Sequence, residues 1–145
     1  MTLASLGVCL ALAAAPQVPP RFVPVSEFTL AWVHSIEKVR WEEDYRVIPG
    51  AAPDAAPQLR AGKARIKGSA AGMEPPPDAV LRNGWYEYQP SPVVNGPLRL
   101  TRSPYVPDYR WCVSGQCVPL SAIMPSDGDI TLLYPWQGPQ AGVSP

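Results

Sequence analysis

The chain has 145 residues, a length that suits one domain with a core of ordinary size. Its 12 lysines and arginines balance 12 aspartates and glutamates, so the formal net charge is zero. A neutral chain lacks the basic surface that binds nucleic acid or anionic lipid. The 20 prolines exceed the usual share of roughly 5%. Because proline interrupts helix interiors and central strands, we expect short strands and many fixed loops.

The N-terminal residues 3–15 form an uncharged apolar run. The run is shorter than the about 20 residues of a membrane span and fits the hydrophobic region of a signal peptide. Ala11-Leu12-Ala13 supplies a small-x-small cleavage pattern. The sequence therefore predicts a signal peptide over residues 1–13, export to the periplasm, and an extended linker over residues 14–27. An uncleaved membrane anchor and a buried N-terminal helix are the alternatives.

Residues 28–47 hold the only histidine and the densest run of charge. Alternate residues are apolar from Phe28 to Trp32 and again from Trp41 to Val47, which is the period-2 pattern of strands. The charged segment 36–40 between them suits an exposed turn. We therefore expect a hairpin here, with His34 continuing the apolar face of its first strand.

The remaining chain predicts further short strands and turns. Strands are expected over residues 58–67, 85–88, 98–102, 109–113, 118–123 and 130–134, and a short helical turn over residues 78–81. The β domain is expected to cover residues 28–136, followed by a flexible tail over residues 137–145. The fold class is mainly β: a single small β sandwich or barrel with proline-rich loops.

Cys112 and Cys117 are separated by four residues that include Gly115. An oxidising compartment favours a disulfide between them, worth about 2 kcal/mol for so short a loop. A redox-active pair would prefer two intervening residues, and zinc would need about four ligands. We expect a structural disulfide, with no metal and no cofactor.

No residue pattern supports catalysis. Ser35 follows His34 directly, and neighbouring strand residues point to opposite faces, so the two side chains cannot form a serine–histidine pair. Glu42, Glu43 and Asp44 are consecutive rather than placed across a cleft, as a glycosidase would need. We expect these carboxylates to form a solvated edge and the protein not to be an enzyme.

A binding role is more consistent with the sequence. His34 lies on an aromatic face with Glu37 close by, and Arg102 and Ser103 end a later strand; together they form a candidate binding cluster. The alternatives are a core or rim histidine and a surface arginine of little energetic value.

The small residues of segment 68–74, with Gly68, Gly72 and Met73 as its structural positions, suit a loop where two backbones pass closely. A phosphate-binding loop would be followed by a helix N-terminus, whereas three prolines follow here.

Several short motifs occur in a fixed order along the chain: His34-Ser35-Ile36-Glu37, Trp41-Glu42-Glu43, Gly72-Met73-Glu74-Pro75-Pro76, Gly84-Trp85-Tyr86, Arg102-Ser103 and the Cys112–Cys117 pair. From about Phe28 to Leu120 the chain resembles the bacterial domain of unknown function 1850 family. The resemblance implies a small exported protein encoded beside TRAP transporters of the TAXI class, which pair a periplasmic solute receptor with an ion-coupled permease.

What the resemblance implies for function is an accessory role in solute import. The partner would be the TAXI-class permease or the solute receptor, on which this protein docks without catalysing a reaction. The alternative is a periplasmic module that binds a small organic-acid solute directly. The resemblance supplies no catalytic or ligand residues.

Overall fold

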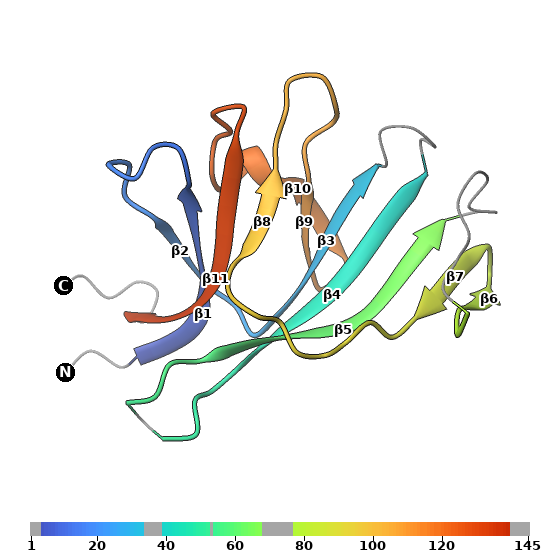
Figure 1. Ribbon diagram of the computed structural model, residues 1–145, viewed down its shortest axis with the longest axis horizontal. Coiled ribbons are helices and arrows are strands. Elements are labelled where there is room, and N and C mark those ends of the chain that lie inside the picture. Colours follow the sequence, from blue (N-terminus) through green and yellow to red (C-terminus); the bar gives the residue numbers. More distant parts are fainter. Residues whose placement is uncertain (1–3, 34–38, 53, 68–76, 140–145) are drawn as a thin grey trace.

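The computed structural model describes residues 4–33, 39–52, 54–67 and 77–139, and these residues form two antiparallel β-sheets that face each other (Figure 1). Over these residues the sheets do not close into a barrel, so the fold is an open β sandwich. The prediction of a mainly β protein is confirmed.

Within the described residues, the larger sheet contains seven strands: β3 (Glu27–Val33), β4 (Arg40–Ile48), β5 (Gln58–Lys67), β6 (Val80–Arg82), β7 (Trp85–Tyr88), β9 (Arg110–Val113) and β10 (Gln116–Pro119). They lie in the order β10-β9-β3-β4-β5-β7-β6. The predicted hairpin is confirmed, because β3 and β4 pair antiparallel with Trp32 opposite Trp41.

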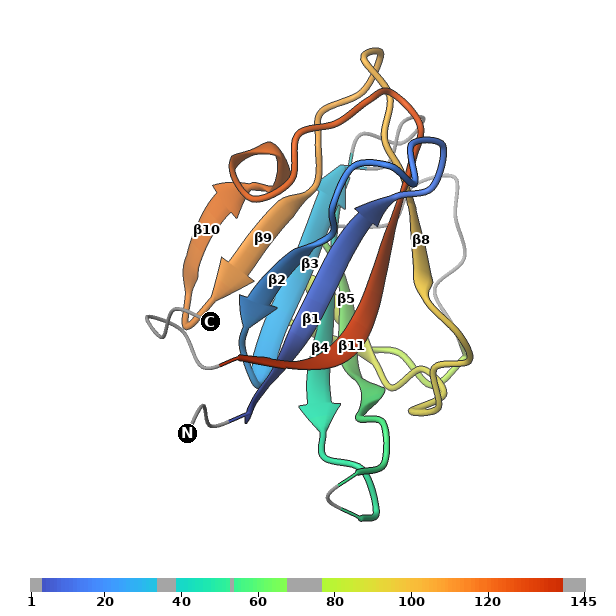
Figure 2. The ribbon, with the colours of Figure 1, turned by 90° about the vertical axis from the view of Figure 1, so that its left-hand side faces the viewer.

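The smaller sheet, counted over the same described ranges, contains four strands: β1 (Ala4–Leu12), β2 (Arg21–Pro24), β8 (Leu98–Thr101) and β11 (Ile130–Pro139). They lie in the order β2-β1-β11-β8. Figure 2 shows β1 and β11, the first and last strands of the chain, side by side in front of the larger sheet. A short 3-10 helix, η1 (Leu120–Ala122), follows β10.

The core lies between the inner faces of the two sheets. Phe28 stacks on Trp111 at a ring-centroid distance of 4.5 Å and on Tyr45 at 5.5 Å. The other buried members come from both sheets and from η1: Val8, Leu10, Leu30, Val47, Leu59, Leu100, Leu120, Met124 and Leu133. Alternation of apolar residues along β3 and β4 therefore places their apolar side chains inside, as the sequence predicts.

Residues 4–12, which lie in the expected signal peptide, form strand β1. β1 pairs with β11 along its whole length and with β2 on its other side, and Val8 and Leu10 are 0% exposed. An uncharged run of small and branched apolar residues satisfies a signal-peptide core and a central strand equally well, so composition and periodicity do not separate the two. In the folded chain, residues 4–12 belong to the sandwich.

Two neighbouring expectations differ as well. The expected linker over residues 14–27 includes β2, which pairs with β1 across Cys9 and Phe22. The expected tail includes residues 137–139, which extend β11 opposite Ala4 to Leu6. A Cβ at Gly7 would collide with the carbonyl oxygen of Val23, which explains a glycine inside a strand.

The predicted helical turn over residues 78–81 is wrong, because Val80–Arg82 forms β6 and pairs with β7. Asn83 and Gly84 connect them with φ values of 50° and 84°, the left-handed backbone of a tight hairpin turn. The predicted strand over residues 118–123 ends at Pro119, where the backbone N–H of Leu120 donates to the carbonyl of Tyr109 at 2.8 Å and η1 begins.

The predicted disulfide is confirmed. Cys112 and Cys117 are directly opposite each other on β9 and β10, and their sulfur atoms are bonded. The bond closes the hairpin at the edge of the larger sheet.

Candidate functional site

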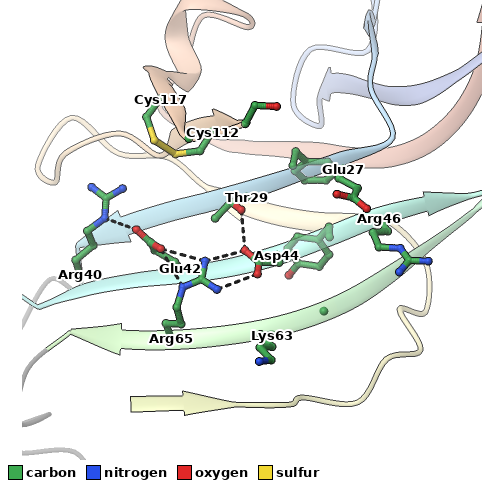
Figure 3. A pocket seen from close by; sticks show the side chains of 15 residues that line it. Glu27, Thr29, Arg40, Glu42, Asp44, Arg46, Lys63, Arg65, Cys112 and Cys117 are labelled. Carbon is green, nitrogen blue, oxygen red and sulfur yellow. Dashed lines mark hydrogen bonds and ion pairs between the residues drawn. A yellow bond between two sulfur atoms is a disulfide. The ribbon is translucent and has the colours of Figure 1, made fainter. Parts of the chain in front are cut away.

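An open groove of about 680 Å³ lies on the outer face of the larger sheet (Figure 3). Its floor comes from β3, β4 and β5, and the disulfide-linked β9–β10 hairpin forms one side. The same alternation that directs Phe28 and Tyr45 inward directs Thr29, Glu42 and Asp44 onto this outer face.

A network of charged side chains covers the groove floor. The Arg65 guanidinium donates to both carboxylate oxygens of Asp44, each at 2.8 Å, and to Glu42 at 3.1 Å. Arg40 donates to the other Glu42 oxygen at 2.8 Å, and the Thr29 hydroxyl donates to Asp44 at 2.7 Å. The expected solvated edge is therefore wrong for Glu42 and Asp44, which are half-buried in a bidentate network.

The backbone at this point contains a β-bulge. Glu43 pairs with Ala64 and Tyr45 pairs with Ala61, so both Gly62 and Lys63 of β5 face Asp44 of β4. A bulge bends its strand and redirects side chains, and bulges occur often beside functional sites. Here it places Lys63 opposite Asp44, where the lysine charge acts on the Asp44 carboxyl.

The network controls the ionisation of Asp44. Burial alone would raise the pKa of this carboxyl, but hydrogen bonds from Arg65 and Thr29 and the charges of Arg65 and Lys63 outweigh burial and lower it. Because the folded pKa lies below the ordinary value of 3.8, ionised Asp44 stabilises the fold above that value. This stabilisation is lost as the pH falls through the lowered pKa.

We therefore expect Asp44→Asn to reduce the free energy of unfolding by about 1 kcal/mol at neutral pH. The difference from the wild type should shrink between about pH 4 and pH 2, measured by urea unfolding. Asp54→Asn is the control, because Asp54 is exposed and makes no ion pair within the described residues. A difference that stays constant over this pH range would contradict the assignment.

A second cluster lies on the inner face, where Glu43 is surrounded by tyrosines. The Tyr45 hydroxyl donates to Glu43 at 2.7 Å. Burial, and next the negative charge of Glu43, raise the pKa values of Tyr45, Tyr88 and Tyr109. Trp32 packs against the ring of Tyr109 at 5.8 Å. The Glu43 carboxylate thus lies among aromatic side chains on the inner face of the larger sheet, the face that also carries Trp41 and Tyr45.

Arg102, a predicted binding residue, is buried and paired. It is 2% exposed, and its Nε and Nη2 atoms donate to the two oxygens of Asp108 at 3.0 and 2.7 Å. Its Nη1 donates to the Met124 carbonyl at 2.7 Å and to the Thr131 hydroxyl at 3.2 Å. The alternative of a surface arginine is therefore wrong. The buried guanidinium links the loop after β8 to the Met124 carbonyl and to Thr131 of β11.

The Arg102–Asp108 pair closes a short loop between β8 and β9. The loop reads Ser103-Pro104-Tyr105-Val106-Pro107. The Ser103 hydroxyl oxygen accepts the backbone N–H of Tyr105 at 3.1 Å, and the Tyr105 side chain is 92% exposed. A hollow of about 340 Å³ lies at the base of this loop, lined by Ser103, Pro104, Asp108, Ser121, Ser126 and Gly128.

The other predicted site residues, His34, Glu37, Gly68, Gly72 and Met73, lie outside the described residues. Their meeting with Arg102 in one polar cluster stays a prediction. Sequence reasoning missed Arg65, Lys63 and Tyr105. The sequence did contain a signal for Arg65, because pairing of β5 with β4 places it opposite Glu42. For Tyr105 the signal was its position between Pro104 and Pro107, which is typical of a fixed, exposed loop.

Within residues 4–33, 39–52, 54–67 and 77–139, no group of three or more His, Cys, Asp or Glu side chains is placed to hold a metal ion. Over these same ranges no helix is long and apolar enough to cross a membrane.

The fold and its surface features define a small β sandwich with a disulfide-linked edge hairpin and a charged outer groove. Residues 28–120 match the family described as domain of unknown function (DUF1850), which is more than half of the chain, and the chain belongs to this family. No curated protein and no solved structure matches it significantly.

Proposed function

We propose that this chain is a non-enzymatic exported accessory protein of a TAXI-class TRAP solute importer, and that it docks on the permease or the solute receptor. The importer comes from the family resemblance. The docking role is supported by one observation above all, the display of Tyr105 on a loop whose two ends are joined by an ion pair between the buried Arg102 and the partly exposed Asp108.

The geometry of the loop favours protein recognition. Pro104 and Pro107 fix two backbone torsions, and the Arg102–Asp108 pair fixes the ends, so little conformational freedom remains to be lost on binding. Tyrosine is one of the residues that dominate binding energy at protein interfaces. An exposed ring on a rigid loop is therefore a suitable contact for a partner surface, with the hollow beside it receiving a partner side chain.

The compartment in this proposal is the periplasm. The Cys112–Cys117 disulfide supports an oxidising environment. The solute receptor and the external loops of the permease are exposed to that same environment.

We expect Tyr105→Ala to weaken docking at least tenfold, since truncation of a central aromatic contact commonly costs about 2 kcal/mol. Biolayer interferometry would measure the affinity of the purified protein for the receptor and for the detergent-solubilised permease encoded beside it. Tyr105→Phe should bind nearly as the wild type does if the ring supplies the contact.

Val93→Ala is the matched control, because Val93 is 62% exposed on another proline-bearing loop. Absence of binding to both importer components, or equal binding by Tyr105→Ala, would overturn the proposed docking mode. In cells, deletion of the gene should impair growth on the transported solute, and the wild type supplied in trans should restore it.

A further inference from the structure

We propose that the groove on the outer face of β3, β4 and β5 is a binding site for a small organic anion that carries two carboxylates, held by Lys63 and Arg46. The site is separate from the Tyr105 loop, and the proposal does not depend on the docking role.

The charges of the groove leave two cations available. Arg40, Glu42, Arg65 and Asp44 neutralise one another through the ion pairs of the floor. Lys63 and Arg46 also line the groove, are exposed, and form no ion pair within the part of the chain that the structure describes.

The two cations flank the Asp44 end of the network (Figure 3). The bulge brings Lys63 opposite Asp44. Arg46 lies on the same face of β4 as Asp44, two residues further along, so their backbone positions are about 7 Å apart along the strand. Two cations on neighbouring strands can each take one carboxylate of a short molecule that carries two. Arginine adds a planar fork that matches a carboxylate, and lysine adds a mobile point charge.

The space for a ligand is maintained by glycines. Gly62 lines the groove beside Asp44, and a Cβ placed there would lie 3.3 Å from the Asp44 Cβ. Gly115 lines the opposite side with φ +81°, and a Cβ placed on it would meet no atom within 4 Å, so the groove is open there. The fixed Arg65–Asp44 pair keeps the floor in one arrangement, so binding would require little reorganisation.

One carboxylate opposes this site and provides a sharp test. Glu27 lines the groove and is the cross-strand partner of Arg46, yet no ion pair joins the two. Its negative charge repels an anionic ligand, so its removal should strengthen binding whereas removal of either cation should weaken it.

The experiment is a titration of the intact protein with succinate at constant ionic strength, followed by NMR shifts of the groove amides. Acetate is the single-carboxylate probe and inorganic phosphate is the probe for a general anion site. We expect succinate to bind more tightly than acetate or phosphate. Lys63→Gln and Arg46→Gln should each weaken it at least threefold, and the double variant at least tenfold.

Glu27→Gln should tighten succinate binding at least twofold, and Arg99→Gln should leave it unchanged. Arg99 is the matched control because it is exposed on β8 of the other sheet. The proposal is overturned if succinate leaves the groove amides unshifted, if phosphate binds as tightly as succinate, or if Arg99→Gln weakens binding as much as Lys63→Gln does. Loss of succinate binding with docking intact would separate this site from the proposed function.

Discussion

A chain that begins at Ala14 is expected not to fold. Such a chain lacks β1, the strand that pairs with β2 on one side and with β11 on the other. Val8 and Leu10 are 0% exposed, and each contributes about 1.5–3 kcal/mol through burial. The backbone groups of β2 and β11 would also lose their partners. The combined loss approaches the about 5–15 kcal/mol by which a domain of this kind is stable.

Circular dichroism and urea unfolding would measure this effect. Leu10→Ala in the full chain should cost about 2–5 kcal/mol, because it leaves a cavity between the sheets. Val18→Ala is the control: Val18 is 37% exposed in the β1–β2 connection, and its truncation should cost less than about 0.5 kcal/mol. A chain from Ala14 that unfolds cooperatively with the same midpoint would show that β1 is dispensable and would favour the signal-peptide interpretation.

Asp108→Ala is expected to destabilise the protein by about 3–5 kcal/mol, because it leaves the Arg102 guanidinium buried without its counter-charge. The change also removes the acceptor for the backbone N–H groups of Tyr109 and Ser121, which donate to Asp108 at 2.9 and 3.0 Å. Urea unfolding at neutral pH would measure the loss.

A double-mutant cycle separates the ion pair from the backbone contacts. Arg102→Met combined with Asp108→Ala should cost less than the sum of the two single changes, since the second change no longer strands a charge. Arg99→Ala, on the exposed face of the preceding strand, is the control and should stay within about 0.5 kcal/mol of the wild type. A loss below about 1 kcal/mol for Asp108→Ala would mean that the guanidinium is solvated or paired elsewhere.

Most of the larger sheet could be predicted from the sequence because its strands, apart from β6, carry strong local signals. Alternation from Phe28 to Trp32 and from Trp41 to Val47 fixed the inward faces of β3 and β4. The β9–β10 hairpin followed from the spacing of Cys112 and Cys117. These features involve residues close in sequence, where periodicity and turn chemistry are informative.

The strands over residues 98–102 and 130–134 of the smaller sheet were predicted, but its central pairing was not, because that pairing joins distant parts of the chain. Nothing local in residues 4–12 indicates that β11 will lie beside them. The family match over residues 28–120 also ends before β11 and begins after β1 and β2.

The candidate groove could be predicted only in part. Thr29, Glu42 and Asp44 share an outward face by alternation, but the register that brings Arg65 and Lys63 to them depends on a bulge. The burial of Arg102 was not predicted either. A strand-end arginine usually meets solvent, whereas here the loop folds back and Asp108 covers it.

The pairing of β1 with β11 has a consequence for the order of assembly during synthesis. The first strand leaves the ribosome with its principal partner still more than a hundred residues away. The larger sheet can form before then, but it would present an uncovered apolar face to water until Ile130–Pro139 is complete. Such distant pairing slows folding and lengthens the time during which the chain can be held unfolded. Late completion of the smaller sheet is compatible with passage across a membrane before folding. It also means that β11, which lies between β1 and β8, completes the sandwich.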